Sequence, residues 1–276
     1  MRLFAVRWLI PLTIVAVLLP ACGDSTRELF EVTTTVVASE YTQDIWVTGP
    51  DDVESDDWGS WPVVYLMHGT GGTGEGLSVM AAELARHGVV VFAPNYRSTE
   101  PQYIEQDAEC GYRYAMTIAE DYGGDPTNPI SVGHSLGATV GLFGGLTDDI
   151  YGPGGTYDLC YGGTPRTDLI VPIAGCYYEY EGNTFQFDTS PYSNEDAQIV
   201  MVVGSDDDVC EAWQSQDAAK ALEVAGYDTD LIEVTDGDHA NVVFYEIVDG
   251  EWIPAPDDPV GDEVVQIILD AIDNSN

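Results

Sequence analysis

The sequence predicts an α/β protein in which helices cover both faces of a mostly parallel central sheet of about eight strands. Short apolar runs, typical of strands buried on both faces, alternate with segments of helical periodicity. The chain has 276 residues, of which 45% are hydrophobic, so it is large enough for a sizeable core. No internal repeat interrupts this alternation, which favours a single domain.

The elements follow one another in a simple order. Two segments near the start alternate like an antiparallel hairpin, namely 31–39 and 44–47. The apolar runs expected to form the other strands are 63–67, 89–93, 130–132, 169–174, 199–203 and 231–234. The segments expected to be helical are 76–87, 105–122, 138–146, 214–225 and 263–272. Residues 147–168, rich in Gly, Tyr and Asp, are expected to form an irregular excursion, for which a small lid is one interpretation.

The N-terminus has the pattern of a targeting segment. Arg2 and Arg7 precede an apolar run over residues 8–19, which is too short for a mature membrane span. The following Leu19-Pro20-Ala21-Cys22 resembles a bacterial lipobox. We therefore expect an exported protein with Cys22 as its lipidated first mature residue. Plain secretion after a nearby cleavage is the alternative.

The domain organisation follows from that pattern. Residues 1–21 are expected to be a signal peptide of the lipoprotein type, and 22–30 a tether. Residues 31–276 then form the folded domain. The expected location is the bacterial cell envelope, through the lipid anchor, or otherwise the surrounding medium.

The chain is strongly acidic, with a formal net charge of −40 at pH 7. Such a surface repels nucleic acid and anionic lipid, so we expect no nucleic-acid partner and membrane contact only through the N-terminal anchor. The scarcity of basic residues also suits high salt, where self-repulsion is screened, and suggests a marine or halophilic origin. The oligomeric state is left open.

Four cysteines remain after Cys22, and an even number in an exported chain indicates two disulfides. Cys176 and Cys210 each follow a predicted strand, which favours them as one pair and leaves Cys110 with Cys160. No C-x-x-C spacing occurs, so a metal site is not expected.

The most informative motif is Gly133-His134-Ser135-Leu136-Gly137, which lies between a β-prone run and a helix-compatible run. In that context G-x-S-x-G forms a nucleophile elbow, a sharp turn that exposes the serine hydroxyl. The two glycines permit close approach of neighbouring backbone. Because the motif is short, its interpretation depends on whether the chain also supplies a base, an acid and oxyanion donors.

A general base is sought first among the four histidines. His134 lies inside the elbow with its side chain directed away from that of Ser135, so it is not the base. His87 is expected at a helix end, and His68 is expected to be structural near the rim of the site. His239 follows a late strand, at the sheet edge where reactive groups gather. His239 is therefore the predicted base.

The acid that orients the base is expected between the serine and the histidine in chain order. The strand 199–203 runs directly into Gly204-Ser205-Asp206-Asp207-Asp208. A carboxylate here would hold the imidazole in the correct tautomer and stabilise the imidazolium. The three adjacent aspartates leave the choice open, and a calcium-binding loop is a weaker rival interpretation.

The oxyanion needs preorganised backbone N–H donors. Leu136, directly after the nucleophile, supplies one, and the loop after strand 63–67 is expected to supply the other. That loop is glycine-rich, and we assign the second donor to Thr70, with Gly71 as the alternative. A phosphate-binding loop is excluded because the G-K-[ST] signature is missing.

With these parts in place, the chain resembles the α/β-hydrolase superfamily from about residue 62 to 243. The features that carry the resemblance are His68-Gly69, the run Ala93-Pro94-Asn95-Tyr96-Arg97, Gly133–Gly137, Gly204–Val209 and His239. The resemblance implies Asp207 as the acid, because Gly204 and Val209 match the family's glycine before and valine after that position. Within the superfamily, the chain is most similar to bacterial carboxylesterases of the dienelactone-hydrolase, feruloyl-esterase and polyester-hydrolase neighbourhood. Two departures are His-Gly-Thr-Gly in place of His-Gly-Gly-Gly, and serine where dienelactone hydrolases use cysteine.

The predicted function is hydrolysis of carboxylic esters through Ser135, Asp207 and His239, with an acyl-enzyme intermediate and no cofactor. The substrate is expected to be a small or polymeric ester. A peptidase or amidase is the alternative within catalysis, and a non-catalytic binding module on a hydrolase scaffold is the alternative outside it. Aromatic residues in or beside loops are candidates to shape a cleft, with Trp213 the best of Trp58, Trp61, Tyr103, Tyr177, Tyr178 and Trp213.

Overall fold

The computed structural model describes most of the chain after residue 60. The described residues are 30–35, 42–49, 61–147, 160, 167–177, 189–190 and 192–275. The predicted signal peptide, Cys22 and the tether up to residue 29 lie outside them, as do Trp58, Tyr178 and nearly all of the 147–168 excursion. Within the described part, no helix has the length and apolar character needed to cross a membrane.

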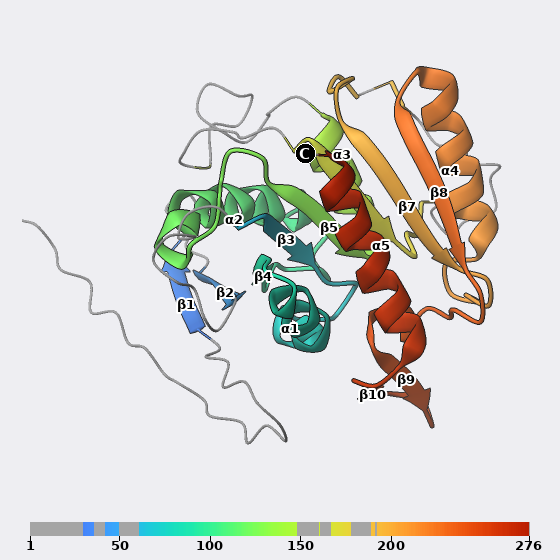
Figure 1. The fold of residues 1–276 in the computed structure, drawn as a ribbon, viewed down its shortest axis with the longest axis horizontal. Coiled ribbons are helices and arrows are strands. Elements are labelled where there is room, and N and C mark those ends of the chain that lie inside the picture. The colour runs from blue at the N-terminus through green and yellow to red at the C-terminus, as the bar shows by residue number, and fades with distance from the viewer. Residues whose placement is uncertain are drawn as a thin grey trace, which may run out of the picture.

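An eight-stranded sheet in the order β1-β2-β4-β3-β5-β6-β7-β8 runs through this part of the molecule (Figure 1). The strands from β4 to β8 in this order are parallel, whereas β2 is antiparallel to β4 and β1 to β2. The strands are β1 (Phe30–Thr35), β2 (Thr42–Thr48), β3 (Val63–Met67), β4 (Val90–Pro94), β5 (Ile130–His134), β6 (Leu169–Ile173), β7 (Gln198–Gly204) and β8 (Asp228–Val234). A separate antiparallel hairpin consists of β9 (Tyr245–Val248) and β10 (Glu251–Pro254).

Helices cover both faces of the sheet, α1 and α5 on one and α2, α3 and α4 on the other (Figure 1). The sequence sets this up through strands that are apolar on both sides, since Val64 and Leu66 face one core and Tyr65 and Met67 the other. The helices are α1 (Ser78–Arg86), α2 (Ile104–Ile118), α3 (Leu136–Leu146), α4 (Ala212–Ala225) and α5 (Pro259–Ser275), with 3₁₀ turns η1 (Glu75–Leu77), η2 (Ala119–Tyr122) and η3 (Asn241–Val243).

The predicted fold class is confirmed, and the strand 63–67 has the bounds that the sequence predicts. Several element ends differ from the prediction, among them those of the predicted helix 263–272, which spans Pro259–Ser275, and one element is missing from the prediction. The predicted helix 76–87 begins with the 3₁₀ turn η1, and the predicted helix 105–122 ends in η2. The predicted helix 138–146 begins two residues earlier, at Leu136, directly after Ser135. The hairpin β9–β10 is absent from the sequence prediction.

Both expected disulfides are present, Cys110–Cys160 and Cys176–Cys210. The first ties α2 to the excursion, and the second joins the loop after β6 to the loop after β7. Disulfides of this kind persist in oxidising compartments, so the protein belongs in a non-reducing environment.

Candidate active site

Ser135 lies at the tight corner between β5 and α3 with φ 57° and ψ −118°, a conformation that a residue with a side chain adopts only under constraint. The flanking glycines explain how the corner can form. A Cβ on Gly133 would lie 2.1 Å from the carbonyl oxygen of Gly137, and one on Gly137 would lie 2.3 Å from that of Met67. The motif therefore forms the strand–turn–helix corner that its spacing predicts, with Ser135 only partly buried.

His239 lies in the loop between β8 and η3, and its ring contacts two of the other predicted site residues. Its Nε2 is 3.0 Å from Ser135 Oγ, and its Nδ1 is 2.8 Å from Asp207 Oδ2. The imidazole is only 4% exposed. The structure thus joins Ser135, His239 and Asp207 in one chain of hydrogen bonds, although more than one hundred residues separate the serine from the histidine.

The three adjacent aspartates of the acid loop differ sharply in their surroundings. Asp207 is buried, and its Oδ1 accepts hydrogen bonds from the amides of Val209 (2.9 Å) and Cys210 (2.8 Å). Asp206 and Asp208 are exposed. Asp207 is therefore the carboxylate that contacts His239, with one oxygen held by backbone amides and the other by the imidazole.

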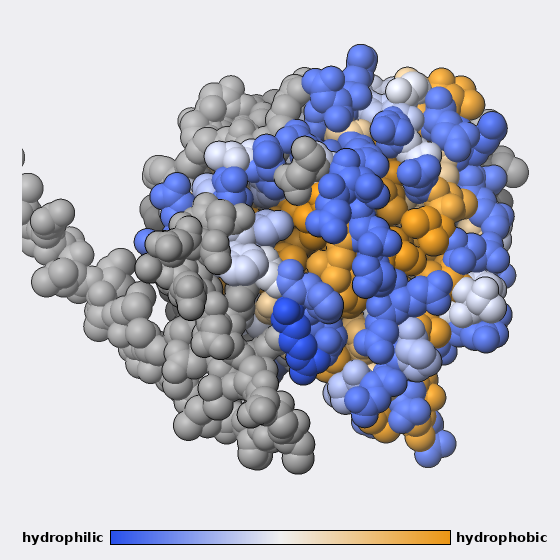
Figure 2. Space-filling model, viewed as in Figure 1, coloured by the Kyte–Doolittle hydropathy of each residue, from blue (hydrophilic) through white to orange (hydrophobic). Residues whose placement is uncertain are grey.

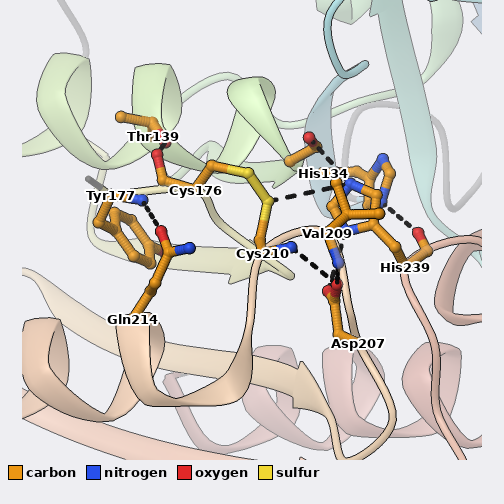
Figure 3. The surroundings of a disulfide bond; sticks show 10 residues. His134, Thr139, Cys176, Tyr177, Asp207, Val209, Cys210, Gln214 and His239 are labelled. Carbon is orange, nitrogen blue, oxygen red and sulfur yellow. Dashed lines mark hydrogen bonds and ion pairs between the residues drawn. A yellow bond between two sulfur atoms is a disulfide. The ribbon is translucent and has the colours of Figure 1, made fainter. Parts of the chain in front are cut away.

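The Cys176–Cys210 disulfide lies beside this chain of hydrogen bonds (Figure 3). Cys210 Sγ is 4.0 Å from His239 Nε2, and the amide of the same cysteine is one of the two donors to Asp207. On the other side, the carbonyl of Cys176 accepts a hydrogen bond from Thr139 Oγ1 on α3 (2.9 Å). The disulfide thereby links the loop that carries Asp207 to the helix that begins at the nucleophile elbow.

The His134 side chain contacts the backbone of His239. Its ring is buried, and Nε2 donates to the carbonyl oxygen of His239 at 2.8 Å. The pKa of His134 is lowered to about 3, mainly because the ring is buried and to a lesser extent because His239 lies beside it. The ring is therefore neutral at ordinary pH. The prediction that His134 points away from the Ser135 hydroxyl agrees with this geometry, but its contact with the His239 loop was not predicted.

The loop after β3 packs directly against the elbow. A Cβ on Gly69 would lie 3.0 Å from Ser135 Cβ and 3.4 Å from its Oγ. The amide of Leu136 is the first in α3 and so has no partner inside the helix. The Gly71 amide, the alternative oxyanion donor, is occupied by Ser98 Oγ at 2.9 Å. Thr70 is exposed between these two glycines, and its role as a donor stays a prediction.

His68 shapes this loop, as the sequence suggested. Its Nδ1 donates to the Gly69 carbonyl oxygen at 2.8 Å, and its own carbonyl accepts the hydroxyl of Tyr96. The imidazole stacks on the Tyr96 ring with 4.3 Å between centroids. Burial lowers the pKa of His68 to about 4. His68 is thus a neutral structural residue beneath the glycine-rich loop.

The aromatic candidates divide by position. Trp61 precedes β3 and packs against Gly88, at the amino end of the strands and away from Ser135. Tyr103 lies against the Arg97 guanidinium at 3.7 Å, and Tyr177 is buried. Trp213 is 44% exposed and donates its indole N–H to Glu211. Trp252 is absent from these candidates, although its ring centroid lies 6.2 Å from that of His239.

Comparison with known proteins identifies the architecture. No protein-family model matches the chain, and no curated protein matches its sequence. Esterase 2 of Thermogutta terrifontis in its apo form has a similar structure, with a TM-score of 0.66 and 14% identity over 88% of this chain and 94% of that chain. The chain has the α/β-hydrolase fold. A truncated carbohydrate esterase from gut microbiota is also similar, with a TM-score of 0.60 and 18% identity over 87% of this chain and 95% of that chain.

In the α/β-hydrolase fold, the nucleophile, the acid and the histidine follow one another in that chain order. Here the hydrogen-bonded residues occur as Ser135 after β5, Asp207 after β7 and His239 after β8. The loops that carry them leave the carboxyl ends of parallel strands, which meet at one edge of the sheet. The fold therefore explains why residues so distant in sequence are neighbours in space.

Proposed function

We propose that this protein is an exported serine hydrolase that cleaves carboxylic esters. The observation that carries the proposal is the hydrogen-bonded chain from Ser135 Oγ through His239 to Asp207, with the serine on a strained elbow. The similarity to structures of esterases supports the same reading. Two further structures of the Thermogutta enzyme, one with butyrate bound and one phosphorylated by paraoxon, support it as well.

In the proposed mechanism, Ser135 Oγ attacks the ester carbonyl carbon while its proton passes to His239 Nε2, 3.0 Å away. Asp207, on the opposite side of the ring, stabilises the imidazolium that forms. The amides of Leu136 and Thr70 hold the oxyanion, each worth about 3 kcal/mol of transition-state stabilisation.

Collapse of the tetrahedral intermediate breaks the bond to the alcohol, which leaves with the proton from His239. A water molecule then attacks the acyl-enzyme, again with His239 as base, and the carboxylic acid is released. The amides, the imidazole and the carboxylate carry these steps, and no cofactor takes part in them.

We further propose that residues 1–21 direct export and that Cys22 carries a lipid anchor. The two disulfides support export, because such bonds persist outside a reducing cytoplasm. Expression in a bacterial host with labelled palmitate tests the anchor. Label should appear on the native chain and be lost in Cys22→Ser, whereas an unlabelled native chain would argue for plain secretion.

The decisive experiment for the hydrolase proposal combines a covalent probe with a substrate panel. A fluorophosphonate should label the native protein and not Ser135→Ala, with the modified peptide containing Ser135. The native protein should hydrolyse p-nitrophenyl esters faster than aminoacyl anilides. Faster anilide cleavage would make the protein a peptidase, and failure to label together with no turnover would favour a binding module.

A further inference from the structure

The hairpin β9–β10 extends from the body of the molecule between the His239 loop and α5 (Figure 1). Its turn contains Asp249 and Gly250, both with positive φ (53° and 83°), as a tight two-residue hairpin requires. Its base is fixed by a hydrogen bond from the Tyr245 hydroxyl to the carbonyl of Gly76 and by one between Ala255 and Phe244 at 2.7 Å. The hairpin is thus held in a defined position, and within the described residues its strands pair with each other and with no further strand.

The two faces of this hairpin differ in charge. Trp252 pairs with Ile247 and Pro254 with Tyr245, and because paired residues share a face, these four form one face without charge. We call it the uncharged face. The opposite face carries the pairs Glu251–Val248 and Ile253–Glu246. Figure 2 shows hydrophobic and hydrophilic residues side by side at the lower end of the molecule, where the hairpin lies.

The uncharged face is directed toward the candidate active site. The Trp252 ring lies edge-on to both imidazoles there, with its centroid 6.2 Å from that of His239 and 6.1 Å from that of His134. It also contacts Tyr245 on the same face at 5.7 Å. In spite of these contacts Trp252 remains 46% exposed, and its partner Ile247 is 49% exposed. An apolar surface therefore extends outward from His239, the general base of the proposed triad.

This distribution is unexpected in a chain of 48 acidic residues. Of the eight large hydrophobic side chains that are exposed in the described part of the chain, four lie on this one hairpin. Two of these four, Trp252 and Ile247, pair with each other on the uncharged face. Exposed apolar groups gathered beside a reactive site indicate a surface that binds an apolar ligand. The surrounding negative charge disfavours substrates that carry carboxylates.

From this juxtaposition we infer that the uncharged face binds the apolar acyl group of the ester whose carbonyl Ser135 attacks. This inference rests on the proposed function and narrows its substrate to uncharged esters with a long or aromatic acyl group. Trp252 and Ile247 are then specificity residues: they contact the acyl chain a few atoms beyond the carbonyl and distinguish long chains from acetate.

The test compares Trp252→Ala with Ile253→Ala, a matched change at the next position on the opposite face. With p-nitrophenyl as the fixed leaving group, kcat and KM are measured for acetate, butyrate and octanoate esters. Trp252→Ala should lower kcat/KM for the octanoate about tenfold, mainly through KM, and change acetate by less than about twofold. Ile247→Ala should act in the same direction, and Ile253→Ala should leave the chain-length profile unchanged.

The possible outcomes separate the inference from the proposed function. If Trp252→Ala lowers kcat equally for every ester, its ring positions His239 and the inference is wrong, while ester hydrolysis stands. If size-exclusion chromatography shows a native dimer that Trp252→Ala dissociates, a second copy covers the face and the inference is also wrong. If Trp252→Ala does not fold, Ile247→Ala and Trp252→Phe carry the same comparison. A native protein that neither hydrolyses esters nor reacts at Ser135 overturns the proposed function itself.

Discussion

His239 and His134 lie with their ring centroids 4.8 Å apart, and each is 4% exposed, yet their chemical surroundings differ. His239 has a carboxylate on one ring nitrogen and a hydroxyl on the other. The hydrogen-bond partner of His134 is a neutral carbonyl oxygen. Equal burial thus accompanies two distinct arrangements of partners.

The difference shows what a buried histidine needs in order to act as a base. Burial disfavours the charged imidazolium, and for His134 it lowers the pKa to about 3. At His239, the Asp207 carboxylate supplies the opposite charge that imidazolium requires while Nε2 faces the Ser135 hydroxyl. The anion behind the ring, rather than the burial of the ring, therefore separates the proposed base from its neighbour.

The largest expected effect on kcat comes from replacing the Asp207 carboxylate, the partner of His239, by a neutral group, since the partner of His134 is neutral. Asp207→Asn should lower kcat about 10³- to 10⁴-fold, because the imidazolium loses its counter-charge and the ring its correct tautomer. Steady-state kinetics on a p-nitrophenyl ester measure the change, and circular dichroism checks the fold. Asp206→Asn and Asp208→Asn are matched controls, since both carboxylates are exposed. A comparable loss in either control, with Asp207→Asn near native activity, would transfer the acid to that neighbour.

A smaller loss of kcat is expected when the Asp207 carboxylate is retained but is positioned less rigidly. The Cys176–Cys210 disulfide holds the residue whose amide donates to Asp207 Oδ1 at 2.8 Å. Replacing both cysteines by serine should lower kcat about 10- to 100-fold with little change in KM, because small displacements of reacting groups are costly.

The second disulfide provides the control for that experiment. Cys110–Cys160 joins α2 to the excursion and takes no part in the contacts of Asp207 or His239 in the described structure. Serine at both of its positions should lower the melting temperature while kcat below that temperature stays near native. Equal losses of kcat in the two double variants would show that the disulfide beside the site has no positioning role.

The parts of the site that the sequence predicts are those with local signals. Gly133 and Gly137 bracket Ser135 for a steric reason that is visible in the spacing alone, and the structure bears this out. The loops after β7 and β8 were identified because apolar runs end where polar residues begin. Among the three aspartates, Asp207 was chosen through a resemblance and not from the residues themselves, and it is the one whose side chain contacts His239.

The parts that the sequence did not predict depend on tertiary contacts. The donation from His134 to the His239 carbonyl joins positions 105 residues apart, and nothing local indicates it. The hairpin β9–β10 did have a local signal, Asp249-Gly250 between two short segments in which apolar residues and glutamates are mixed, but its strands are only four residues long. Trp252 could have been found from that signal, whereas its contact with His239 could not.

The smallest effect on catalysis is expected at His134, where the change appears in stability instead. The pKa of this histidine falls from 6.5 in the unfolded chain to about 3 in the folded one, so between these pH values the unfolded chain binds a proton that the folded protein does not. The free energy of unfolding therefore decreases as the pH falls through this window, by up to about 1.4 kcal/mol per pH unit for one such group. Above pH 6.5 this contribution to stability is fully present.

His134→Gln retains an N–H donor for the His239 carbonyl and removes the titrating ring. Urea denaturation at several pH values between 4 and 7 should show a shallower pH dependence in this variant, by about one proton, than in the native protein. His87→Gln, at an exposed position beside α1, is the matched control in which a histidine away from the site is replaced. If the unfolding free energy of His134→Gln depends on pH as steeply as that of the native protein, the folded native protein can protonate His134. The contrast between His134 and His239 would then no longer rest on the charge of the hydrogen-bond partner.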